Sequence, residues 1–249
     1  MKDTVLYIPT SDDKKIYAVL NQAGDAPAEK LLVIAHGVKG CVEEQQFVIT
    51  RNYFIEKGWD VVRFAFYCGC EQDARLMKDC TLETHAQDLG TVVQNFAGQY
   101  QNIYVAGHSY GGLTTVLANI ENIKAVSLWD ASYGYEEPNN FWFTDVVVEN
   151  GQPFLRWDSD VLVGKAMLEE GRALTREKTQ AWAERFSTPV QVVLAGSKGE
   201  SDGRAESLYA DLGSSEKEFT AVEGANHTFS ANNTAPILAE HTYNWLSKF

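Results

Sequence analysis

Residues 103–113 of the chain read Ile-Tyr-Val-Ala-Gly-His-Ser-Tyr-Gly-Gly-Leu, in which β-forming residues lead to a serine between two glycines. The spacing is Gly-x-Ser-x-Gly around Ser109, and an apolar run compatible with a helix follows. The stretch therefore predicts a strand, a tight turn and a helix, with the serine Oγ exposed at the edge of a sheet. Ser109 is a candidate nucleophile. The alternative is a glycine-rich turn with an incidental serine, because the five-residue pattern also occurs by chance.

The rest of the chain alternates between apolar runs and segments with helical spacing. We expect strands at residues 5–8, 15–20, 30–35, 59–66, 101–106, 123–129, 189–195 and 217–222. We expect helices at residues 42–57, 82–96, 113–119, 175–186, 204–212 and 234–249. This order predicts an α/β fold whose sheet is mostly parallel, with an N-terminal antiparallel hairpin and helices on both faces.

Length and composition indicate one large domain over residues 1–249, since no long linker interrupts the chain. The formal net charge is −13, which argues against binding to nucleic acid or to anionic membranes. The N-terminus shows no secretory signal, and no apolar stretch is long enough to span a bilayer. We therefore expect a cytoplasmic protein. The composition does not indicate an oligomeric state.

Four cysteines occur, at positions 41, 68, 70 and 80. Without a secretory signal, reduced thiols are the expectation. Cys68-Gly69-Cys70 with Cys80 could suggest a metal cluster, but Cys-x-Cys is not the usual zinc spacing and no His-x-x-x-His pattern accompanies it. We expect no metal.

A serine hydroxyl needs a base to take its proton, and that base is usually a histidine. His227 lies in the loop between the last expected strand and the last expected helix, where it can bend over Ser109. A solvated loop histidine is the alternative. His85 and His241 fall on expected helices, where solvent exposure is expected. His108 precedes Ser109, and its side chain should pack structurally.

The segment His36-Gly37-Val38 follows the expected strand at 30–35. A glycine there lets the backbone turn so that the next N–H points at the serine. The N–H groups of Val38 and Tyr110 are therefore candidates for a two-donor oxyanion hole. The alternative is that His36-Gly37 only ends a strand.

The succession of a strand ending in His-Gly, a Gly-His-Ser-Tyr-Gly-Gly turn and a Gly-Ala-Asn-His loop resembles the α/β-hydrolase family, and in particular its serine esterases and lipases. The resemblance covers nearly the whole chain. It implies Ser109 as nucleophile and His227 as base. It also implies a cap inserted between the sixth and seventh strands, and residues 131–188 are such an insertion.

The acidic partner of the histidine departs from the family pattern, which commonly places it after the seventh strand as Gly-x-x-Asp. Residues 196–202 read Gly-Ser-Lys-Gly-Glu-Ser-Asp, so Gly199 holds the expected position, and Glu200 and Asp202 are displaced. A minority of family members place the acid after the sixth strand, where this chain has Asp130. A carboxylate next to an apolar strand needs a partner, because its desolvation is costly. Asp130, Asp202 and Glu200 all stay candidates, with Asp130 preferred.

These residues together predict a hydrolase that cleaves carboxylic esters through an acyl-enzyme on Ser109, without a cofactor. The aromatic residues of the insertion, including Phe141, Trp142 and Phe143, favour a small-molecule ester with a small, apolar or aromatic acyl group. One alternative is a non-catalytic protein that binds a small molecule on the same fold. Another is an enzyme that cleaves thioesters, amides or carbon–carbon bonds.

Overall fold

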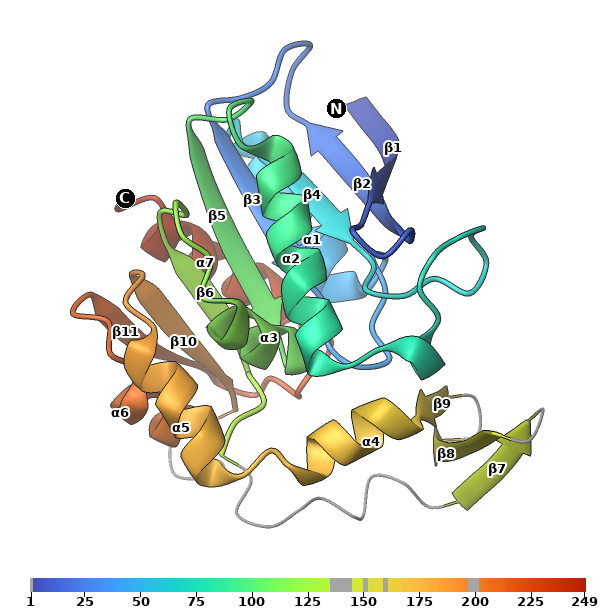
Figure 1. Cartoon of the computed structure of the whole chain (residues 1–249). Coiled ribbons are helices and arrows are strands. Elements are labelled where there is room, and N and C mark those ends of the chain that lie inside the picture. Colours follow the sequence, from blue (N-terminus) through green and yellow to red (C-terminus); the bar gives the residue numbers. More distant parts are fainter. Residues whose placement is uncertain (1, 135–144, 150–151, 159–160, 197–201) are drawn as a thin grey trace.

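A computed structural model describes residues 2–134, 145–149, 152–158, 161–196 and 202–249; at 145–147, 149, 152–158, 161–162 and 172 it describes the backbone alone. The chain is built around an eight-stranded sheet with helices on both faces (Figure 1). Its strands run in the order β1-β2-β4-β3-β5-β6-β10-β11. They are β1 (Lys2–Pro9), β2 (Lys15–Gln22), β3 (Lys30–Ala35), β4 (Asp60–Phe64), β5 (Asn102–His108), β6 (Val126–Trp129), β10 (Val190–Ala195) and β11 (Lys217–Val222).

The direction of the strands follows the prediction. β1 pairs antiparallel with β2, and β2 pairs antiparallel with β4. Every other pairing in this sheet is parallel. The predicted mostly parallel sheet with an antiparallel N-terminal hairpin is confirmed.

The central strands are buried on both faces, which explains their continuous apolar runs. In β3, Leu31 and Val33 pack into the core on one face, whereas Leu32 and Ile34 pack into the core on the other. Helices α2 (Leu82–Phe96), α3 (Tyr110–Ala118), α5 (Arg176–Arg185) and α6 (Arg204–Asp211) cover the first face. Helices α1 (Gln45–Glu56) and α7 (Ala235–Leu246) cover the second. Among the described residues, no helix is long and apolar enough to cross a membrane.

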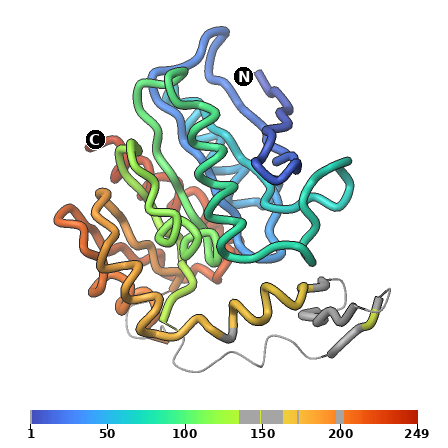
Figure 2. Tube along the Cα trace, in the orientation of Figure 1, coloured from blue at the N-terminus to red at the C-terminus, as the bar shows by residue number. Residues whose placement is uncertain are grey.

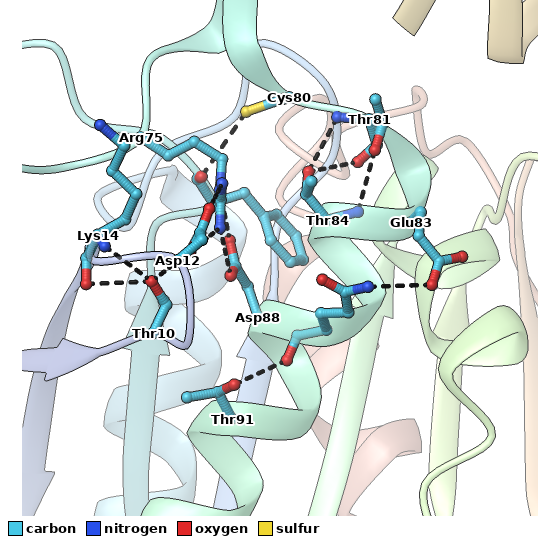
Figure 3. Close-up of polar contacts among 12 residues, drawn as sticks. Thr10, Asp12, Lys14, Arg75, Cys80, Thr81, Glu83, Thr84, Asp88 and Thr91 are labelled. Atoms are coloured by element: carbon cyan, nitrogen blue, oxygen red, sulfur yellow. Dashed lines mark hydrogen bonds and ion pairs between the residues drawn. The ribbon is translucent and has the colours of Figure 1, made fainter. Parts of the chain in front are cut away.

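Helix α2 begins at a capping box. The Thr81 side chain accepts a hydrogen bond from the backbone N–H of Thr84, and the Thr84 side chain accepts one from the backbone N–H of Thr81 (Figure 3). The predicted helix at 82–96 is confirmed with these bounds. One of its predicted features is wrong. His85 is 1% exposed rather than solvated, because it lies on the apolar side of the helix between Leu82 and Leu89.

An insertion lies between β6 and β10, and the coloured parts of the trace in Figure 2 show its described segments. Within it, β7 (Asp145–Glu149), β8 (Gln152–Asp158) and β9 (Val161–Gly164) form a separate antiparallel sheet, followed by α4 (Lys165–Arg172) and α5. These three strands were not predicted. In Figure 1, α4 and the small sheet lie beyond the carboxyl ends of the central strands. The aromatic cluster Phe141, Trp142 and Phe143 lies outside the described residues, and a cap role for residues 131–188 stays a prediction.

Helix α4 is tied to α2 by one carboxylate. The Glu170 side chain accepts hydrogen bonds from the backbone N–H groups of Leu82 and Glu83 at the start of α2. Negative charge is favourable at a helix N-terminus, where N–H groups lack intrahelical partners. Glu170 therefore holds the insertion against the main domain. The short 3₁₀ helix η1 (Met77–Asp79) precedes this contact.

Candidate active site

The chain passes from β5 to α3 through a single residue, Ser109. Its φ and ψ angles are 55° and −120°, a region that L-residues other than glycine rarely adopt. Two hydrogen bonds fix the turn to the end of β6 and to the insertion. The Ser109 N–H donates to the Trp129 carbonyl at 2.9 Å, and the Ser109 carbonyl accepts from the Ser132 N–H at 3.0 Å. The predicted strand, tight turn and helix are present.

The two glycines of the motif are required by close backbone approach. A Cβ on Gly107 would lie 2.6 Å from the Gly111 carbonyl oxygen. A Cβ on Gly111 would lie 2.5 Å from the Ala35 carbonyl oxygen at the end of β3. Any side chain at either position would therefore force the turn away from the sheet.

His227 reaches Ser109 from the loop between β11 and α7. Its Nε2 lies 3.0 Å from the Ser109 Oγ, and its Nδ1 lies 2.5 Å from Asp130 Oδ2. With the proton on Nδ1, the imidazole donates to the carboxylate, and its Nε2 is left to accept the serine proton. The structure thus brings together three of the residues that the sequence singled out.

The loop that carries His227 is held by side-chain hydrogen bonds. The Asn226 Oδ1 accepts from the backbone N–H groups of Ser230 at 2.9 Å and Ala231 at 3.0 Å. The His108 Nε2–H donates to the His227 carbonyl at 2.8 Å. Burial, together with a smaller effect of the neighbouring His227, lowers the pKa of His108 to about 4, so this imidazole is neutral near pH 7. The predicted structural packing of His108 fits this position.

Asp130 directly follows β6, and its backbone adopts a φ of 42°. Its N–H donates to the Val193 carbonyl at 2.7 Å, and its Oδ1 accepts from the Ala195 N–H at 3.3 Å. The side chain is 13% exposed. Both carboxylate oxygens therefore have partners, one on His227 and one on the neighbouring strand.

The other two acidic candidates are not at His227 in the part of the chain that is described. The Asp202 carboxylate accepts from the Arg204 Nε at 2.5 Å and from the Arg204 backbone N–H at 3.1 Å. Asp202 lies just before α6, which begins at Arg204. Glu200 lies outside the described residues.

The segment after β3 lies against Ser109. A Cβ on Gly37 would stand 2.9 Å from the Ser109 Cβ, so only glycine permits this approach. Tyr110 is the first residue of α3, and Val38 follows Gly37, so both candidate oxyanion donors belong to segments that adjoin Ser109. The His36 ring stiffens this segment. Its Nδ1–H donates to the Gly37 carbonyl at 2.7 Å, and its Nε2 accepts from the Phe66 N–H at 3.0 Å. Burial lowers its pKa to about 4.

Glu44 is a further residue of this region that the sequence analysis did not identify. Its carboxylate accepts from the Cys41 N–H at 3.2 Å and from the Gln46 amide, and it closes the loop that begins at Gly37. Burial raises its pKa. No short motif surrounds Glu44, so only the three-dimensional path of the loop shows that its carboxylate holds the loop together.

Among the described residues, no group of three histidine, cysteine, aspartate or glutamate side chains could hold a metal ion. Ser109, His227 and Asp130 form a hydrogen-bonded chain of protein groups. Such a chain can move a proton from a serine hydroxyl to an imidazole.

Comparisons with known proteins bear on the fold. A scan against protein-family models gives no match, and a search of curated proteins gives none either. Solved structures match over nearly the full length. Est1E from Butyrivibrio proteoclasticus, in a structure with bound ferulic acid, has a TM-score of 0.75 at 19% identity, covering 97% of this chain and 99% of that chain.

Two further solved structures are similar. A dienelactone hydrolase from Anabaena variabilis has a TM-score of 0.70 at 13% identity, with 100% of this chain and 98% of that chain covered. The Pyrococcus furiosus esterase Pf2001 has a TM-score of 0.67 at 13% identity, with 99% and 93% covered. Together with the strand order and the helices on both faces, these likenesses show that the chain has the α/β-hydrolase fold.

Proposed function

We propose that the protein is a serine hydrolase that cleaves carboxylic esters through an acyl-enzyme on Ser109. The observation that carries the proposal is the continuous chain of hydrogen bonds from Ser109 Oγ through His227 to Asp130. A serine hydroxyl becomes a nucleophile when an adjacent base accepts its proton, and the base works best when a carboxylate orients it.

In the proposed reaction, Ser109 Oγ attacks the ester carbonyl while His227 Nε2 takes the hydroxyl proton. Asp130 holds the Nδ1–H tautomer and stabilises the imidazolium that forms. The proton then passes from His227 to the leaving alcohol. Water, deprotonated by the same imidazole, attacks the acyl-enzyme and releases the carboxylic acid and Ser109.

The negative charge on the tetrahedral intermediate needs donors in place before the reaction. We assign them to the backbone N–H groups of Val38 and Tyr110. The close approach of Gly37 to Ser109 supports the first assignment, and the position of Tyr110 at the start of α3 supports the second. The positive end of the α3 dipole adds to the effect.

For the substrate we propose a small-molecule ester whose acyl group is small, apolar or aromatic. Two observations support this class. The insertion carries α4 beside the carboxyl ends of the strands, where the site lies (Figure 1). The similar structure of Est1E contains ferulic acid, an aromatic acid. We propose that residues 131–188 act as the cap that selects the acyl group.

The first test is turnover of p-nitrophenyl acetate by the wild type and by Ser109→Ala. The wild type should hydrolyse the ester, and Ser109→Ala should lose about 10⁴-fold or more in kcat/KM while it stays folded. Ser247→Ala, a change at an exposed serine after α7, is the matched control and should keep full activity. Absence of wild-type turnover, with tight binding of the ester, would favour a non-catalytic binding protein. Turnover of thioesters or amides, without turnover of esters, would favour a thioester or amide hydrolase.

A further inference from the structure

The segment between β4 and η1 carries two thiols that the proposed hydrolysis does not use. Cys68 and Cys70 are both free cysteines, and their Sγ atoms lie 3.2 Å apart. A disulfide needs a separation of about 2.05 Å, so the sulfur atoms would have to approach by only about 1 Å. The two sulfur atoms are therefore close enough to form a disulfide after a small movement.

The base of this segment is anchored to the main domain. The Cys68 N–H donates to the Arg75 carbonyl at 3.0 Å. The Arg75 guanidinium in turn is hydrogen-bonded to Asp12 in the β1–β2 turn and to Asp88 in α2 (Figure 3). A Cβ on Gly69 would meet no atom within 4 Å, so the residue between the two cysteines has room to move. Cys68 is therefore held to the main domain, whereas Gly69 and Cys70 have room to move toward it.

The two cysteines differ in their surroundings. Cys70 is exposed, whereas Cys68 is partly buried and packs against the apolar cluster of Val19, Val42 and Ala65. Burial, followed by the hydrogen bond with Cys70, raises the pKa of Cys68. An external reagent therefore meets Cys70 first, and Cys68 is placed to attack the Cys70 sulfur once that sulfur has entered a mixed disulfide.

The other two cysteines are placed differently. Cys80 is buried, and its thiol donates to the Leu76 carbonyl at 3.3 Å. Cys41 is exposed in the loop after β3, and no cysteine contact is recorded for it among the described residues.

We propose that Cys68 and Cys70 form a thiol–disulfide exchange site that accepts low-molecular-weight disulfides. The Cys70 thiolate attacks one sulfur of an external disulfide RS–SR, forms the mixed disulfide Cys70–S–S–R and releases RS⁻. The Cys68 thiol gives its proton to solvent, and its sulfur attacks the Cys70 sulfur and expels the second RS⁻. The dithiol is oxidised to the Cys68–Cys70 disulfide, and one RS–SR is reduced to two RSH.

The test treats the folded, full-length protein with excess glutathione disulfide. Free thiols are then blocked with iodoacetamide, and the digested chain is mapped by mass spectrometry. In the expected product neither Cys68 nor Cys70 is a free thiol or carries glutathione, and the peptide that spans residues 68–70 contains a disulfide. Dithiothreitol should restore all four thiols. No ester enters the assay, so the result is independent of the proposed hydrolysis.

Three variants separate the steps. Cys68→Ser should stop at a stable glutathione adduct on Cys70, because the resolving thiol is missing. In Cys70→Ser, glutathione should attach to Cys68 at least tenfold more slowly than it attaches to Cys70 in Cys68→Ser, because Cys68 is partly buried. Cys41→Ser, the matched control at an exposed cysteine outside the pair, should form the Cys68–Cys70 disulfide at the wild-type rate. A stable glutathione adduct on wild-type Cys70, or a disulfide that includes Cys41, would overturn the proposal, as would retention of all four thiols.

Discussion

β6 and β10 are parallel neighbours whose carboxyl ends lie at the same edge of the sheet, yet the acidic residues that follow them have different partners. Asp130 comes directly after β6 and hydrogen-bonds to His227. Asp202 comes seven residues after the last residue of β10, Ala195, and pairs with Arg204, the first residue of α6. The sheet fixes the position of a carboxylate that directly follows a strand. A carboxylate farther along the loop is free to cap the next helix instead.

The largest expected effect concerns these two carboxylates. Asp130→Asn should lower the kcat for p-nitrophenyl acetate by about 10⁴-fold, because the amide favours the wrong imidazole tautomer. Asp202→Asn is the matched control, and it should cost about tenfold or less, as expected for a surface change. Steady-state kinetics on both variants, with circular dichroism to confirm folding, measures the difference. The reverse order of losses would mean that the acid follows β10, as in the commoner family plan.

A smaller effect is expected where a third strand, β3, ends at the same edge. Gly37→Ala places a methyl group 2.9 Å from the Ser109 Cβ, so the loop with Val38 must shift. A shift of about 1 Å at such a site typically costs about 10²-fold in rate, and we expect a loss of that size in kcat. Gly24→Ala, where a Cβ meets nothing within 4 Å, is the control and should keep the wild-type rate. Equal rates for both variants would remove the loop after β3 from the site.

The smallest expected effect is on the free energy of unfolding, and it concerns two buried histidines at the ends of β3 and β5. His36 and His108, which precede or adjoin the site, have pKa values lowered to about 4 by burial. In the unfolded chain both titrate near 6.5, so the unfolded state binds more protons between pH 6.5 and pH 4. The free energy of unfolding should therefore fall as the pH falls through this window, by about 1–3 kcal/mol for each histidine.

Urea unfolding at pH 7 and at pH 4.5 measures this loss. His108→Asn cannot titrate in this range, so its stability should depend less on pH than that of the wild type. His241→Asn, a change on α7 away from the site, should retain the wild-type dependence. If His108→Asn and the wild type lose the same free energy, protonation of His108 is not a cause of acid destabilisation.

Much of the fold was predictable because its signals are local. The strand–turn–helix around Ser109, the apolar run of β3 and the periodicity of α2 each lie within about 15 residues of sequence. His227 was also identifiable, since a histidine in the last loop can reach the edge that holds Ser109. These signals need no knowledge of how distant segments pack.

The remaining features depend on packing between distant residues. Asp130 and His227 are 97 residues apart in the chain, so no local pattern in the sequence joins them. The burial of His85 was mispredicted, because a histidine on a helix was expected to be exposed, whereas this one lies on the apolar side with Leu82 and Leu89. The small sheet β7–β9 was missed, because its segment shows neither clear alternation nor helical periodicity. The contacts of Glu44 depend on the shape of the loop after β3, and no sequence motif predicts that shape.

The central claim is that Ser109, His227 and Asp130 act as one unit. Labelling with a fluorophosphonate probe tests it most directly, because the probe reports the nucleophilicity of a serine without a choice of substrate. The account predicts labelling of the wild type and of Asp202→Asn at Ser109 with similar rates, and a rate lower by several orders of magnitude for Asp130→Asn. Labelling at another residue, or equal rates for wild type and Asp130→Asn, would contradict it.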